Sequence, residues 1–182
     1  MLIGLTGTPG TGKTSASELV KAYCGYRVIH LNKLIREKHL YSGVDEVRDT
    51  LVADMDKVSA HVSGLIGESD AVTILDSHLS HYIADIVIVL RASPGVLGER
   101  LSHRDYSQAK ISENVEAEAL DVILVESVEW CEKVFEIDTT DVTVEKVATD
   151  VREIINALLH GDDGAMLLKY KPGSLDWSED VF

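Results

Sequence analysis

The sequence predicts an α/β fold, a three-layer sandwich in which one five-stranded parallel sheet lies between two layers of helices. Short apolar runs bounded by turn residues alternate with longer stretches whose apolar residues recur at helical spacing. The chain has 182 residues, a length that suits one core, so we expect a single domain over residues 1–182. No apolar run approaches the roughly 18 residues that a membrane span needs, and no membrane association is expected.

Five short apolar runs are the candidate strands. They are nearly continuous in apolar character, as expected for strands that are buried on both faces of a parallel sheet. The runs cover residues 2–6, 27–30, 71–75, 85–90 and 134–137. The turn residues and longer helical patterns between them then form the two outer layers.

The clearest helix is the last one, because its apolar residues recur at steps of three and four. These residues are Val144, Val147, Val151, Ile154, Ile155 and Leu158. Thr143 stands just before them, and its hydroxyl can cap the first turn. The tail that follows, residues 161–182, is expected either to pack as an irregular strap or to fray, and we assign it no chemistry.

Two more helices are expected between the fourth and fifth strands. Ser93 and Pro94 are a typical cap and first helical residue, so a helix should begin there. A longer helix is expected from residue 112 to 131. Its acidic residues are expected to form a solvated face: Glu116, Glu118, Asp121 and Glu126.

Charge and cysteine content exclude some classes of function. Seventeen basic and 31 acidic residues give a net charge of −14, which disfavours extensive direct binding of nucleic acid. An acidic surface suits either solubility in a salty cytoplasm or docking of a basic protein partner, and the charge alone does not choose between them. Cys24 and Cys131 lack the paired spacing of a zinc site, and we expect both to be inert. The N-terminus lacks the basic region of a signal peptide, so a cytoplasmic protein is expected.

The strongest motif is GTPGTGKT, from Gly7 to Thr14, which matches GxxxxGK[ST] between a predicted strand and a predicted helix. The glycines let the loop turn its N–H groups toward phosphate oxygens, and the helix N-terminus adds partial positive charge. Lys13 is expected to bridge the outer phosphates of ATP, and the Thr14 hydroxyl to ligate Mg²⁺. The expected nucleotide contacts are Gly7, Gly10, Thr11, Gly12, Lys13, Thr14 and Ser15.

A second set of polar residues follows the third predicted strand. In P-loop folds such a strand delivers an acid beside magnesium, and Asp76 stands at that end, where a strand-ending turn is the alternative. His78 can orient or deprotonate a water because imidazole exchanges a proton near neutral pH; a helix-capping role is its alternative. His81 is expected to be structural.

Three arginines are candidates for contact with phosphates. Arg36, on a short helix after the second strand, can grip an acceptor phosphate. Arg100 and Arg104 lead into a stretch with loop character and can close over transferring phosphates as a lid, although surface ion pairs are the commoner use of such residues. We expect one of these two to be functional.

Over essentially its whole length, the chain resembles the family of archaeal adenylate kinase-like proteins and eukaryotic adenylate kinase isoenzyme 6. The matching segments are GTPGTGKT, LIREKHLYSGVDE, DSHLSH, VIVLRASPGVLGERL, residues 112–124 and VFEIDTT. The resemblance implies a small nucleoside monophosphate kinase with strand order 2-3-1-4-5. It also implies an acceptor-binding region near residues 30–53 containing Arg36, and a short lid near residues 103–113 containing Arg104.

The resemblance further implies a role in maturation of the small ribosomal subunit and in rRNA processing, through ATPase activity and contact with a basic ribosomal protein. Asp76 and His78 match the Asp-x-His motif associated with that ATPase role. The sequence departs from the family where Asp105 replaces a lid glycine, and where residues 141–143 lack the Gly-Lys pair expected beside adenine. The base preference is therefore left open.

Three hypotheses remain. The first is a broad-specificity kinase that transfers the ATP γ-phosphate to AMP or a related nucleoside monophosphate, with catalytic roles for Lys13, Asp76 and His78. The second is an assembly factor in which ATP binding and hydrolysis switch the affinity for a ribosomal partner. The third is a P-loop kinase that phosphorylates another small metabolite.

Overall fold

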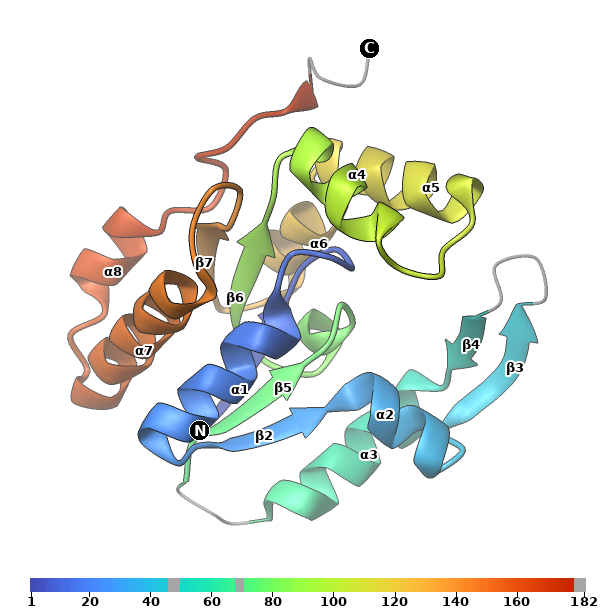
Figure 1. Cartoon of the computed structure of the whole chain (residues 1–182). Helices are drawn as coiled ribbons and strands as arrows, with labels where there is room; N and C mark the ends of the chain where they lie inside the picture. Colours follow the sequence, from blue (N-terminus) through green and yellow to red (C-terminus); the bar gives the residue numbers. More distant parts are fainter. Residues whose placement is uncertain (46–49, 68–70, 179–182) are drawn as a thin grey trace.

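A computed structural model describes residues 1–45, 50–67 and 71–178 of the chain. A five-stranded parallel sheet runs through the molecule in the order β2-β5-β1-β6-β7 (Figure 1). Counted over these five strands alone, this is the order 2-3-1-4-5 that the family resemblance implied. The strands are β1 (Leu2–Thr6), β2 (Arg27–His30), β5 (Thr73–Asp76), β6 (Ile86–Arg91) and β7 (Lys133–Asp138). All five predicted runs are therefore strands, with ends shifted by at most two residues.

Neighbouring residues of each strand point to opposite faces of the sheet. Apolar side chains lie on both faces, and helices cover both. On one face, Ile88 and Leu90 of β6 belong to a core with α1 (Lys13–Cys24) and α7 (Val144–His160). On the other face, Val87 and Val89 pack with α6 (Val122–Trp130). Leu75 of β5 packs with α3 (Met55–Ile66) on that same side.

The predicted last helix is confirmed as α7. The Thr143 hydroxyl accepts a hydrogen bond from the Lys146 backbone N–H, as expected of its cap. After it, the tail packs as a strap in the part that is described. It forms α8 (Gly164–Lys169), and Tyr170 is buried in the core beside α7. Residues 179–182 of the predicted tail lie outside the described residues.

The helix predicted over residues 112–131 was wrong in two respects. The structure has two helices, α5 (Gln108–Ala119) and α6, separated at Asp121, whose φ of 58° is left-handed and ends α-helical hydrogen bonding. Glu118 was assigned to a solvated face, but its side chain is buried. Pro94 begins α4 (Pro94–Ser102) as predicted, with Ser93 at the cap position.

Several elements were not predicted. Between α2 (Leu31–Glu37) and α3 lies an antiparallel hairpin of β3 (Tyr41–Asp45) and β4 (Thr50–Ala53), in the predicted acceptor region. Residues 46–49 of that region lie outside the described residues. A short 3₁₀ helix, η1 (Ser80–Tyr82), follows β5. Within the described ranges, no helix is long and apolar enough to cross a membrane.

Candidate active site

The phosphate loop connects β1 to α1 and takes its shape from its glycines. Gly7, Gly10 and Gly12 have φ values of 131°, 102° and 92°, which side-chain-bearing residues rarely adopt. A Cβ atom on Gly7 would also lie 2.2 Å from the Leu90 carbonyl oxygen, and one on Gly10 would lie 2.7 Å from Leu97 Cδ1. The loop is thus packed directly on β6 and α4, and these glycines allow it.

Lys13 is the first residue of α1, and its side chain folds back over the loop. The Nζ atom donates hydrogen bonds to the carbonyl oxygens of Gly7, at 2.7 Å, and Thr8, at 2.9 Å. Burial lowers the pKa of this ammonium to about 8, against the opposing influence of the Asp76 and Glu118 carboxylates. The charge therefore lies inside the loop, where phosphate oxygens would be received.

Thr14 and Asp76 meet at the carboxyl edge of the sheet, as parallel pairing of β1 with β5 requires. The Thr14 hydroxyl donates to Asp76 Oδ2 at 2.8 Å, and Asp76 itself is buried. A hydroxyl and a carboxylate supply the hard oxygen atoms that Mg²⁺ prefers, and the loop beside them would receive phosphates that complete its coordination. The residues present therefore fit a magnesium ion.

Sequence analysis missed two further members of this group. His30 Nδ1 lies 2.8 Å from Asp76 Oδ2, and its Nε2 lies 2.9 Å from Glu18 Oε1. His30 is the last residue of β2, and its register with Asp76 brings the two side chains together. The sequence held a signal for this contact, because two adjacent parallel strands end in polar residues at the same edge. The strand order implied by the family resemblance already placed these two strands side by side, and the pairing of β2 with β5 confirms it.

His78 lies two residues beyond Asp76 and is half-buried. Burial and the nearby positive charge of Lys13 lower the pKa of its imidazole to about 4, so the ring is neutral at pH 7. His81 bridges Thr6 Oγ1, at 3.3 Å, and Glu126 Oε2, at 3.0 Å, inside the fold. That position fits the structural role expected for His81.

A cavity of about 260 Å³ opens beside the phosphate loop. Its lining combines predicted nucleotide-binding residues of the loop, two arginines in and just after α4, and three valines around the start of α7. The lining residues are Gly10, Thr11, Gly12, Ser15, Arg100, Arg104, Thr139, Val142, Val144 and Val147. Its size and mixed apolar and polar lining suit a nucleoside.

The three candidate arginines have different surroundings. Arg100 is tied to the loop after β7, donating to the carbonyl oxygens of Thr139, at 2.6 Å, and Thr140, at 3.0 Å. Arg104 lines the same cavity with an exposed side chain, so it is the freer of the two. Arg36 lies exposed on α2, the helix that directly follows β2, and is not among the cavity-lining residues.

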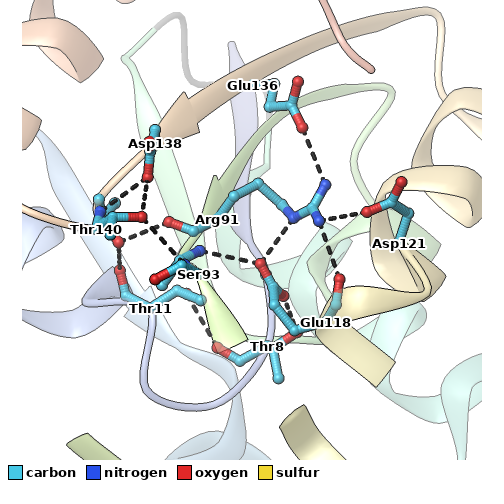
Figure 2. A network of polar contacts seen from close by, with 12 residues as sticks. Thr8, Thr11, Arg91, Ser93, Glu118, Asp121, Glu136, Asp138 and Thr140 are labelled. Atoms are coloured by element: carbon cyan, nitrogen blue, oxygen red, sulfur yellow. Dashed lines mark hydrogen bonds and ion pairs between the residues drawn. The ribbon is translucent and has the colours of Figure 1, made fainter. Parts of the chain in front are cut away.

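A buried polar network on the other side of the loop was also missed. Arg91, at the end of β6, pairs with Glu118 at 2.7 Å and with Glu136 at 2.9 Å (Figure 2). The second oxygen of the Glu118 carboxylate accepts a hydrogen bond from the Thr8 hydroxyl. Glu118 could not be recognised from sequence, because it lies in an acidic stretch that also contains exposed carboxylates such as Glu113 and Glu116.

The two cysteines do not belong to this site. Cys24 ends α1 and packs against the main core, whereas Cys131 is the capping residue directly after α6. Burial raises the pKa of the Cys131 thiol to about 11, which leaves almost no thiolate at neutral pH and makes the residue a poor nucleophile.

Comparisons with known proteins indicate the family and the fold of this chain. A family model described as an AAA domain matches residues 3–121. Proteins named "Putative adenylate kinase" from Methanosarcina acetivorans and Archaeoglobus fulgidus are 55% and 43% identical, over the whole of this chain and 100% and 94% of theirs. The solved shikimate kinase of Bacteroides thetaiotaomicron, 17% identical, has a TM-score of 0.57 over 86% of this chain and 98% of its own. The Bacillus subtilis YorR protein, 16% identical, scores 0.56 over 88% and 98%.

Proposed function

The chain belongs to the family of archaeal adenylate kinase-like proteins, and on that premise we propose that it transfers the ATP γ-phosphate to AMP or a related nucleoside monophosphate. The observation that carries the proposal is the contact of Thr14 with Asp76 at 2.8 Å, directly beside the Lys13 ammonium. Lys13 and Thr14 stand in the chain between Gly12 and Ser15, two of the residues that line the cavity of about 260 Å³.

Each part of the site has a role in this reaction. The backbone of the phosphate loop and Lys13 hold the ATP phosphates, while Arg104 stabilises the charge of the transferring group from the proposed lid, residues 103–113. Arg36 would bind the acceptor phosphate from the proposed acceptor region, residues 30–53. Thr14 and Asp76 would hold Mg²⁺, which neutralises phosphate charge when bound, and His30 orients the Asp76 carboxylate.

The cavity also supports broad base specificity. Val142, Val144 and Val147 offer apolar surface to the face of a base, and stacking on such surface does not distinguish one base from another. The loop over residues 141–143 lacks the Gly-Lys pair of relatives, so that loop supplies no lysine to select adenine.

A second function is favoured by His78. A neutral imidazole near Lys13 and Asp76 can accept a hydrogen bond from water and orient it, so we propose that the site also hydrolyses ATP when no acceptor is present. Hydrolysis of this kind would suit a cytoplasmic switch in small-subunit maturation and rRNA processing, in which the net charge of −14 attracts a basic ribosomal protein.

One experiment separates these functions. ATP consumption by the pure protein is measured with magnesium alone, then with each nucleoside monophosphate, and then with a basic small-subunit ribosomal protein. The kinase proposal expects AMP to accelerate consumption and to be converted to ADP. If no monophosphate is phosphorylated while the ribosomal protein alone accelerates hydrolysis, the kinase proposal fails and the switch stands. Phosphorylation of none of these acceptors, with ATP still bound, would favour another small metabolite.

A further inference from the structure

A buried carboxylate touches the phosphate loop from behind. Glu118, near the end of α5, accepts a hydrogen bond from the Thr8 hydroxyl, and both side chains are 2% exposed (Figure 2). Thr8 is the second residue of the loop. A negative charge beside a loop that binds polyanionic phosphates needs a reason, since it opposes the charge of the ligand.

Arg91 fixes this carboxylate from the opposite side. Its Nε donates to Glu118 Oε1 at 2.7 Å, and its Nη2 donates to the Glu118 carbonyl oxygen at 3.0 Å. The Ala92 backbone N–H also donates to Oε1, at 3.0 Å. Glu136 holds Arg91 Nη1 at 2.9 Å, and the Trp177 ring covers the guanidinium at 4.9 Å. Glu118 is therefore held directly at the end of β6, and through Arg91 it is linked to β7 as well.

Thr8 connects Glu118 to the rest of the loop through its backbone carbonyl group. Its carbonyl oxygen accepts hydrogen bonds from Lys13 Nζ at 2.9 Å, the Thr11 N–H at 3.2 Å and the Thr11 hydroxyl at 3.0 Å. Three donors of the loop and of α1 therefore converge on the residue that Glu118 holds. Movement of Thr8 would disturb all three at once.

We propose that Glu118 is a positioning residue, which acts through the Thr8 hydroxyl to hold the phosphate loop in the shape that receives ATP. The inference rests on the proposed use of ATP. Helix α5 begins at Gln108 inside the proposed lid and ends beside Glu118, so one rigid element joins the lid to the back of the loop. A loop held in advance does not have to be ordered when ATP binds, and this raises affinity.

The test removes the hydroxyl of Thr8 without changing its shape. Binding of magnesium ATP is measured by calorimetry, and KM values for ATP and AMP by steady-state kinetics, for Thr8→Val and Thr8→Ser. Thr8→Val should weaken ATP binding about tenfold or more and raise the KM for ATP in parallel, with the KM for AMP unchanged. Thr8→Ser keeps the hydroxyl and should bind ATP within about twofold of the parent.

Tyr170→Phe is the matched control, because it also deletes a buried hydroxyl that donates to a carboxylate, here Asp150 at 2.8 Å, away from the loop. It should lower the melting temperature without changing ATP affinity. Thr8→Ala, which leaves room for a water on Glu118, replaces the valine variant if that one does not fold.

The two ideas fail in different ways. Parental ATP affinity in folded Thr8→Val or Thr8→Ala would overturn the positioning role, as would a loss of affinity in Tyr170→Phe equal to that in the Thr8 variants. Absence of AMP phosphorylation by the parent protein would instead defeat the proposed kinase, and the calorimetric comparison would still decide the role of Glu118.

Discussion

Lys13 concentrates the chemistry of the site in one side chain. Its ammonium is buried among carbonyl oxygens, where its electrostatic influence on a phosphate is stronger than it would be in water. The Asp76 and Glu118 carboxylates favour its charged form, so the loop holds a cation where the outer phosphates of ATP are expected.

Lys13→Ala should therefore lower the turnover of ATP with AMP by about a hundredfold or more, the loss seen when one preorganised charge-stabilising group is removed. The measurement is kcat at saturating substrates. Lys169→Ala serves as the control, because Lys169 pairs with Glu153 on the surface. The turnover of this variant should equal that of the parent protein. Parental turnover from Lys13→Ala would refute the assignment of the loop.

His78→Ala should separate the two proposed reactions. Transfer to AMP needs no group that positions water, whereas the proposed hydrolysis would use the neutral His78 imidazole to orient the attacking water. We expect the variant to lose acceptor-free ATP hydrolysis about a hundredfold and to keep AMP phosphorylation within severalfold. Equal losses in both reactions would show that His78 serves the nucleotide site as a whole.

Individual residues of the site were predictable to different degrees. The phosphate loop and Asp76 follow from spacing and from their place after a strand, so sequence alone located them. His30 and Glu118 depend on which strands are neighbours and on which side of a helix faces inward. Those are tertiary facts that no local pattern in one sequence contains.

At the scale of elements, strands were easier to predict than helix boundaries. A buried parallel strand is a short apolar run, and five such runs gave five strands. The break between α5 and α6 occurs at Asp121, which has a left-handed backbone conformation and pairs with Arg91. An aspartate inside an acidic helical pattern does not by itself predict that conformation. The β3–β4 hairpin is short, its residues alternate between half-buried and exposed, and its sequence lacks a strong apolar alternation.

Helix α3 offers a test of element stability at one residue. Gly64 lies inside the helix with open space around its missing Cβ, so Gly64→Ala should raise the free energy of unfolding by about 0.5–1 kcal/mol. Gly67→Ala is the counterpart, because Gly67 caps the same helix at φ 56° and alanine there should destabilise the protein. Both effects are read from urea unfolding curves. The opposite order of stability would contradict the helix end described here.

At the scale of the whole molecule, the tail completes the core on the side of α7. The Tyr170 hydroxyl donates to Asp150 at 2.8 Å and to Glu153 at 3.0 Å, and its carbonyl oxygen accepts from the Glu136 N–H at 2.9 Å. The tail thereby joins a helix to the edge strand β7. From its composition, the tail was expected either to pack as a strap or to fray. The contacts of Tyr170 show that it packs as a strap in the part that is described.

Truncation after residue 160 should therefore destabilise the protein by about 3 kcal/mol or more, since burial of a large side chain and several hydrogen bonds are lost together. Thermal and urea unfolding measure the effect. A chain that ends at Pro172 keeps Tyr170 and should retain most of the stability. If the chain that ends at residue 160 is as stable as the full chain, the strap adds nothing to the stability of the core.

We propose above all that the site directs the γ-phosphate of ATP to a nucleoside monophosphate. The most direct measurement follows labelled γ-phosphate in the presence of magnesium and AMP, with the products separated and counted. We predict that most of the label appears in the β-phosphate of newly formed ADP, with two ADP formed for each ATP consumed. Label found only in inorganic phosphate, with AMP unchanged, would contradict the account.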